Sequence, residues 1–138
     1  MILEFDGIQF SYTENPLLTG IYVKCETNKI TGLLGRNGSG KSTLLKIAFG
    51  SIRTDVISVR IDGSYISPPS FSNRTIAYLP QDSFIPPYLT VREILKLYKI
   101  DPERFVSDFP EISDNLNKKK FEMSGGIVRL FENLLILF

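Results

Sequence analysis

The sequence predicts an α/β fold with an N-terminal antiparallel β-subdomain, a phosphate-loop (P-loop) nucleoside-triphosphatase core and a partial α-helical subdomain. Three observations predict it. Residues 1 to about 35 alternate apolar and polar side chains, as strands do. A glycine-rich segment, Gly35–Thr43, lies between a strand-like run and a helix-like run. Beyond Pro86-Pro87 the apolar residues recur at helical spacing. We therefore expect two domains, a core with the antiparallel β-subdomain over 1–85 and a helical subdomain over 86–138.

The N-terminal elements follow from period-two alternation and from turn residues. Ile2–Asp6 alternates, and Ile8–Tyr12 continues the pattern, so this stretch predicts a strand. Thr13–Pro16 predicts a turn because asparagine and proline favour turn conformations. A second strand is expected over Ile21–Cys25, followed by a turn at Thr27-Asn28.

The segment Gly35–Thr43 fits the phosphate-binding pattern G-x-x-x-x-G-K-[ST]. Glycines let the backbone curl so that successive N–H groups point at an anion, and the helix that follows adds the positive end of its dipole. Lys41 supplies a charge for the β- and γ-phosphates, and the Ser42 hydroxyl can ligate Mg²⁺. A glycine-rich turn without a ligand is the alternative. The candidate phosphate-binding residues are Gly35, Asn37, Gly38, Ser39, Gly40, Lys41, Ser42 and Thr43.

Flanking segments support this prediction. Lys29–Gly35 predicts a buried strand leading into the loop, and Ser42–Phe49 predicts a helix that stops at Gly50.

Three further elements are expected between this helix and residue 81. They are a strand over Val56–Ile61 with a turn at Asp62-Gly63, a loop over Ser67–Ser70, and a buried strand over Thr75–Leu79 that ends at Pro80-Gln81.

Capping residues place the helices of the second part. Thr90 and Glu93 form a capping box, and Asp101-Pro102 is an N-cap with proline at the first helical position. Ser124 is expected to cap a last, amphipathic helix. Its predicted apolar face consists of Ile127, Leu130, Phe131, Leu134, Leu135 and Phe138. Because the helix ends in the apolar run Leu134–Phe138 without a cap, we expect the sequence to be cut short there.

Composition excludes several classes of function. The net charge of +1 and the lone basic run Lys118–Lys120 do not favour a nucleic-acid partner. The chain has no histidine and one cysteine, Cys25, so histidine catalysis, a zinc site and an intrachain disulfide are not expected. The N-terminus lacks the pattern of a signal peptide, and no apolar run is long enough to span a bilayer.

Four segments in order resemble an ATP-binding cassette (ABC) ATPase domain, and the resemblance covers essentially the whole chain. Phe10-Ser11-Tyr12 lies where this family has the aromatic residue that stacks on adenine. Gly35–Thr43 matches the Walker A loop, and Tyr78–Gln81 is similar to the Q-loop. Met123–Gly126 is similar to the signature motif Leu-Ser-Gly-Gly-Gln.

The resemblance implies roles for these residues. Tyr12 would stack on the adenine of ATP, and Ser42 together with Gln81 would hold Mg²⁺. Gln81 would also position water at the hinge of the helical subdomain. The signature residues would bind, through backbone N–H groups, the γ-phosphate held by an opposite domain. These are Ser124, Gly125 and Gly126.

Two departures from the family pattern affect the expected chemistry. Ile127 stands in place of the signature glutamine, and Met123 in place of leucine. Nothing in the sequence resembles Walker B with its catalytic glutamate, and after the signature the only carboxylate is Glu132. The family would place these catalytic elements beyond Phe138. We therefore expect residues 1–138 alone to bind MgATP weakly and to hydrolyse little of it.

The resemblance implies an ATP-binding subunit of an ABC transporter. Such a domain would pair with a second ABC domain, identical or different, and would act on a transmembrane permease subunit. It would lie in the cytoplasm, peripheral to the membrane. Two alternatives remain, a truncated nucleotide-binding remnant that does not hydrolyse ATP and a non-transport ABC-type ATPase. The short interval between the Walker A loop and the signature, without sustained heptads, disfavours the coiled-coil ATPases of the latter class.

Overall fold

A computed structural model describes residues 1–54, 56–66 and 76–138. Its contacts divide the chain into two compact units, Met1–Tyr78 and Leu79–Phe138. Each unit is described by itself below. The domain boundary expected after residue 85 lies within the second unit.

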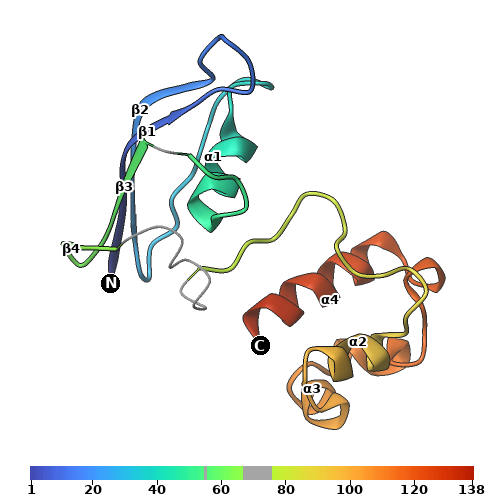
Figure 1. Ribbon diagram of the computed structural model, residues 1–138. Helices are drawn as coiled ribbons and strands as arrows, with labels where there is room; N and C mark the ends of the chain where they lie inside the picture. Colours follow the sequence, from blue (N-terminus) through green and yellow to red (C-terminus); the bar gives the residue numbers. More distant parts are fainter. Residues whose placement is uncertain (55, 67–75) are drawn as a thin grey trace. The chain divides into compact units, whose positions relative to one another are not determined.

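The first unit is an antiparallel sheet with one helix beside it (Figure 1). Its four strands lie in the order β2-β1-β3-β4. They span Ile2–Phe10 (β1), Leu18–Glu26 (β2), Val56–Ile61 (β3) and Ser64–Tyr65 (β4). The helix α1 spans Lys41–Phe49 and stops at Gly50 as predicted, and Gly50 has the left-handed conformation, with a φ of 89°. The fold is therefore mixed α/β, as the sequence predicts.

Alternation along β1 builds the core of this unit, with one irregularity. Phe5 and Ile8 are both buried although they are three residues apart, because the register with β2 shifts between them. Gly7, with a φ of 70°, occupies this bulge. Both side chains can thus pack on the same cluster as Leu44 and Ile47 of α1.

Two predicted buried strands are not strands in this structure. Residues 29–35 have no regular structure, and Ile30 and Leu34 are 102% and 94% exposed. Residues 76–79 are likewise irregular. A strand needs hydrogen-bonded neighbours, and the sheet formed by the described residues contains neither segment. The predicted loop Ser67–Ser70 and Thr75 lie outside the described residues.

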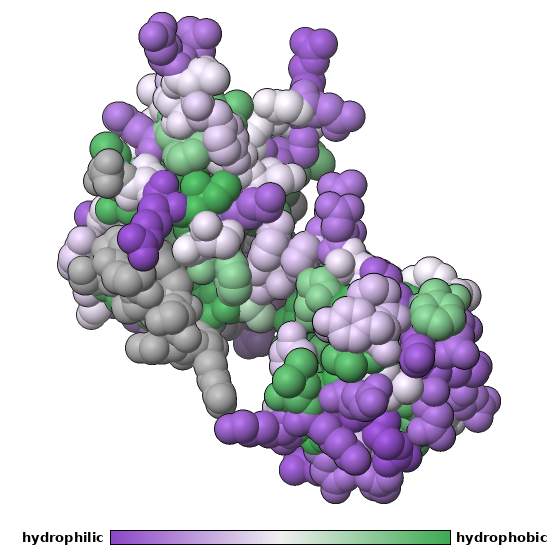
Figure 2. Space-filling view, turned by 45° about the vertical axis from the view of Figure 1, so that its right-hand side comes forward, coloured by the Kyte–Doolittle hydropathy of each residue, from purple (hydrophilic) through white to green (hydrophobic). Residues whose placement is uncertain are grey.

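The second unit is helical. It contains α2 (Val91–Leu97), α3 (Pro102–Asp108) and α4 (Gly125–Leu137), with two short 3₁₀ helices at Pro110–Asn115 and Lys120–Glu122. In Figure 2 hydrophilic side chains cover much of its visible surface, with apolar side chains between them. Its core lies between the helices and contains Ile85, Val91, Ile94, Leu95, Phe105, Ile112, Val128, Phe131 and Leu135.

The predicted helix caps are confirmed. Thr90 and Glu93 form both hydrogen bonds of the capping box, the Asp101 side chain accepts from the Glu103 amide at 3.1 Å, and the Ser124 hydroxyl accepts from the Ile127 amide at 3.3 Å. The buried face of α4 overlaps the predicted one. Phe131 and Leu135 are buried as predicted, and Ile127, Leu130 and Leu134 pack against the same core while partly exposed. Phe138 is 43% exposed, and the face also includes Val128 and Glu132, which were not predicted. A carboxylate therefore lies on the face that packs.

Candidate functional site

The glycine-rich loop has a backbone that only glycine adopts easily. Gly38 and Gly40 have φ values of 83° and 88°, in the left-handed region where other residues are strained. Gly40 is also closely surrounded, because a Cβ built on it would lie 2.8 Å from Leu18 Cδ2 and 3.3 Å from Leu17 Cγ. Since Gly40 is the N-cap of α1, these contacts fix where the loop enters the helix.

Lys41 folds back over this loop. Its ammonium group donates to the carbonyl oxygens of Gly35 at 2.7 Å and Arg36 at 2.8 Å. The charge is thus held against the loop backbone, and Ser42, the next residue of α1, is exposed. The first amides of a helix have no partner within it and attract anions. The Lys41 ammonium, the first amides of α1 and the Ser42 hydroxyl therefore all belong to the start of this helix.

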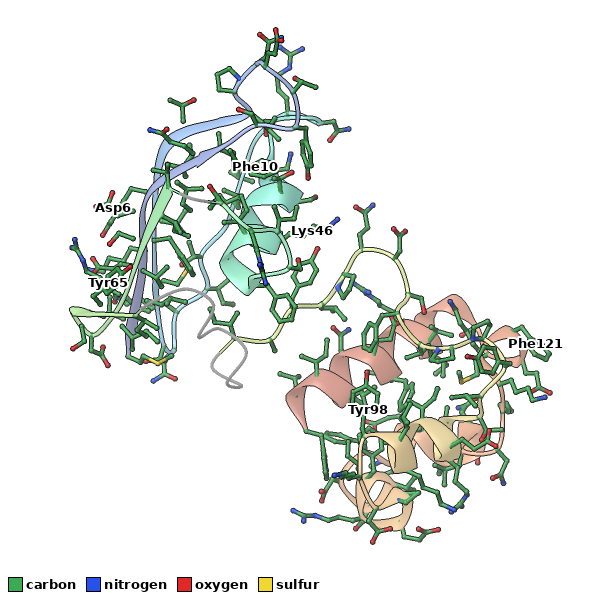
Figure 3. All side chains as sticks on the ribbon, viewed as in Figure 1. Asp6, Phe10, Lys46, Tyr65, Tyr98 and Phe121 are labelled. Carbon is green, nitrogen blue, oxygen red and sulfur yellow. The ribbon has the colours of Figure 1, made fainter. Side chains whose placement is uncertain are left out.

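Tyr12 lies beside the same helix end. Its hydroxyl is 3.3 Å from the Thr43 hydroxyl, and its ring meets that of Phe10 edge-on, with centroids 4.8 Å apart. Figure 3 shows Phe10 close to α1. The Tyr12 side chain is 64% exposed, so much of its ring surface is open to a planar ligand. The first unit thus brings Tyr12 together with the predicted phosphate-binding residues.

Gln81 and the Ser124–Gly126 segment belong to the second unit. Gln81 is exposed and lines a surface hollow of about 430 Å³ together with Gly125 at the start of α4. The rim of this hollow includes Phe121, which is 72% exposed and lies at the outer edge of the unit in Figure 3. Ser83 lines it as well, and its buried hydroxyl has no hydrogen-bond partner among the described residues.

The sequence analysis named Glu132 as a carboxylate after the signature motif but did not predict that it is buried. The side chain is 1% exposed, and its two carboxylate oxygens accept hydrogen bonds from the Phe84 amide and the Arg129 guanidinium. One signal was present in the sequence, because Glu132 lies four residues after Val128 and next to Phe131, on the apolar side of the helix. Neither Glu132 nor Arg129 was expected to belong to a site.

None of the helices in residues 1–54, 56–66 and 76–138 has both the length and the apolar character needed to cross a bilayer.

Comparison with known proteins shows similarity to ABC transporter proteins across most of the chain. A family model described as "ABC transporter" matches residues 18–132. The chain is 36% identical over 127 residues to "Probable branched-chain amino acid transport ATP-binding protein LivF" of Archaeoglobus fulgidus, covering 83% of this chain and 54% of that protein. It is 37% identical over 97 residues to "Lipopolysaccharide export system ATP-binding protein LptB" of Haemophilus influenzae, covering 68% of this chain and 40% of that protein.

Solved structures show the same fold. One described as the structure of an ATP-binding subunit of an ABC transporter superimposes with a TM-score of 0.79 at 22% identity. It covers 99% of this chain and 61% of its own. A nucleotide-free ATP-binding cassette from an ABC transporter gives a TM-score of 0.76 at 25% identity, covering 99% of this chain and 64% of its own. The chain therefore spans less than two thirds of the proteins and structures described here.

Proposed function

Because the chain belongs to the ATP-binding family of ABC transporters, we propose that it binds MgATP as part of an ATP-binding subunit of a transporter. ABC ATPases as a family bind ATP with Mg²⁺. The observation that carries the proposal is the geometry of the glycine-rich loop. Gly38 and Gly40 hold their left-handed backbone, and the Lys41 ammonium lies against two loop carbonyls. A phosphate that enters the loop offers this ammonium a fully charged partner in their place.

We assign the roles of individual residues as follows. Lys41 and the amides of the loop bind the β- and γ-phosphates. Ser42 and Gln81 ligate Mg²⁺, and Gln81 also positions water. Tyr12 stacks on adenine, which its exposure and its position beside Thr43 support. The Ser124–Gly126 segment presents the amides of the α4 N-terminus to the γ-phosphate of a second ABC domain, since Ser124 caps that helix and leaves Gly125 and Gly126 exposed.

The proposed partners are a second ABC domain and a transmembrane permease, with the subunit on the cytoplasmic side of the membrane. The relatives support this, because their names describe ATP-binding proteins of branched-chain amino acid transport and of lipopolysaccharide export. Those two systems move unlike substrates, so the proposal names no cargo.

Calorimetric titration of the chain with MgATP tests the proposal. We expect Lys41→Ala to weaken binding by roughly tenfold or more, as the loss of a charged hydrogen-bond donor to phosphate predicts. Lys46→Ala is the matched control. Lys46 is the same residue type in the last turn of the same helix, is exposed, and lies away from the loop.

The control variant should bind MgATP as the wild type does. Equal affinity of all three proteins, or an equal loss in both variants, would contradict the assignment of the loop as the phosphate site. Circular dichroism of each variant establishes that α1 and the sheet are still formed.

A further inference from the structure

The segment that carries Gln81 is attached to helix α4 at both of its ends. On one side, the Arg129 guanidinium donates to the Pro80 carbonyl at 2.6 Å. On the other side, the Phe84 amide donates to Glu132 Oε1 at 3.1 Å. Gln81 lies between these two backbone attachments. Its position is thus set by two side chains of a helix that lies far away in the sequence.

The two α4 side chains also hold each other. The same Arg129 nitrogen donates to Glu132 Oε2 at 3.2 Å, so the carboxylate has a partner on each oxygen. A carboxylate that is 1% exposed is costly to bury unless such partners compensate it. An apolar residue would pack here at lower cost. What the ionic pair adds is two directed hydrogen bonds to one backbone segment.

The same helix begins with the signature residues. Ser124 caps α4, and Gly125 lines the hollow that Gln81, Arg129 and Glu132 line as well. The Gln81 segment and the helix N-terminus are therefore connected through one rigid element. A displacement of α4 carries Pro80 and Phe84 with it while the two hydrogen bonds persist.

We propose that Arg129 and Glu132 are positioning residues that hold the Gln81 segment on α4, so that Gln81 and the signature segment move as one body. The inference rests on the proposed function, because it concerns the Mg²⁺-binding role assigned to Gln81. Neither positioning residue is among those assigned to the nucleotide. Arg129 and Glu132 act only through the backbone at Pro80 and Phe84.

Hydrogen–deuterium exchange tests the attachment without any nucleotide. In Glu132→Met, which removes the acceptor of the Phe84 amide, and in Arg129→Met, the amides of 81–84 should exchange about two- to twelvefold faster, the factor expected for loss of one hydrogen bond. Exchange within α2 and α4 should stay as in the wild type. The matched controls are Glu111→Met and Arg104→Met, because both residues are exposed on other elements of the same unit. Unchanged exchange at 81–84, or faster exchange throughout the helical unit, would overturn the proposal.

A second measurement asks whether the attachment serves the metal site. The affinity for ATP is measured with and without Mg²⁺. Glu132→Met should reduce the gain in affinity that Mg²⁺ gives, leave Mg²⁺-free binding unchanged, and add nothing to Gln81→Ala in the double variant. Arg129→Met should reduce the gain as well, and Arg129→Lys, which keeps the charge and a donor, should keep part of it. A gain that is unchanged in Glu132→Met overturns the positioning role.

A failure of the proposed function can be distinguished from a failure of the positioning role. If the wild type binds no ATP, the proposed function fails, and the exchange experiment still decides whether α4 holds the segment. If the wild type binds MgATP through Lys41 but the Glu132 and Arg129 variants keep the full effect of Mg²⁺, only the present inference fails.

Discussion

Gly40 shows how one residue can determine the geometry of the glycine-rich loop. It combines a φ of 88° with a neighbour, Leu18, that leaves no space for a Cβ. Gly40→Ala should therefore destabilise the first unit by about 2 kcal/mol, the sum of left-handed strain and displacement of a packed side chain. Chemical denaturation followed by circular dichroism measures this, and the same variant should bind MgATP more weakly.

Gly38→Ala separates the cost of left-handed strain from the cost of displacing a packed side chain. Gly38 has a similar φ of 83°, but a Cβ there would meet nothing within 4 Å. We expect it to lose only the strain, about 1 kcal/mol. If the two alanine variants lose the same stability, the contact with Leu18 contributes nothing and the packing argument for Gly40 is wrong.

Among the elements, α2 has a cap whose strength depends on pH. The Thr90 backbone amide and the Thr90 hydroxyl both donate to Glu93 Oε2 at 2.8 Å, and these hydrogen bonds, the backbone one first, hold the pKa of Glu93 below its ordinary value. A lowered pKa means that the folded state favours the carboxylate. The stabilisation is then complete above pH 4.5, the ordinary value, and is lost as the pH falls through the lower folded pKa.

We expect Glu93→Gln to reduce the free energy of unfolding at pH 7, and the difference from the wild type to shrink below pH 4.5, the ordinary pKa of the group. Urea denaturation at a series of pH values measures it. Glu111→Gln, an exposed change in the neighbouring 3₁₀ helix, is the control. A difference that stays constant from neutral pH to acid would mean that the Glu93 charge does not support the cap.

At the same scale, the elements divide into those the sequence could predict and those it could not. Caps at Thr90, Asp101 and Ser124 were predictable because their partners lie within three residues. A strand over 29–35 was predicted from its apolar residues, yet a strand depends on neighbours that a local pattern does not show. The hydrogen bond between Glu132 and the Phe84 amide could not be predicted for the same reason, since the two residues are 48 positions apart.

For the molecule as a whole, the predicted fold class and family are confirmed. The candidate site was predictable to the extent that it is one continuous motif. Gly35 to Thr43 is contiguous in sequence, and Tyr12 joins it across the first unit through Thr43. The placement of Gln81 on α4 depends on contacts between distant segments, so no local pattern could predict it.

The most direct test of the central claim is a crystal structure of the chain with Mg²⁺ and a non-hydrolysable ATP analogue. We expect the β-phosphate among the amides of the glycine-rich loop. We also expect the Lys41 ammonium to leave the carbonyls of Gly35 and Arg36, which it contacts at 2.7 and 2.8 Å, for the phosphates. A nucleotide bound elsewhere, or bound while Lys41 keeps both carbonyl contacts, would contradict the claim.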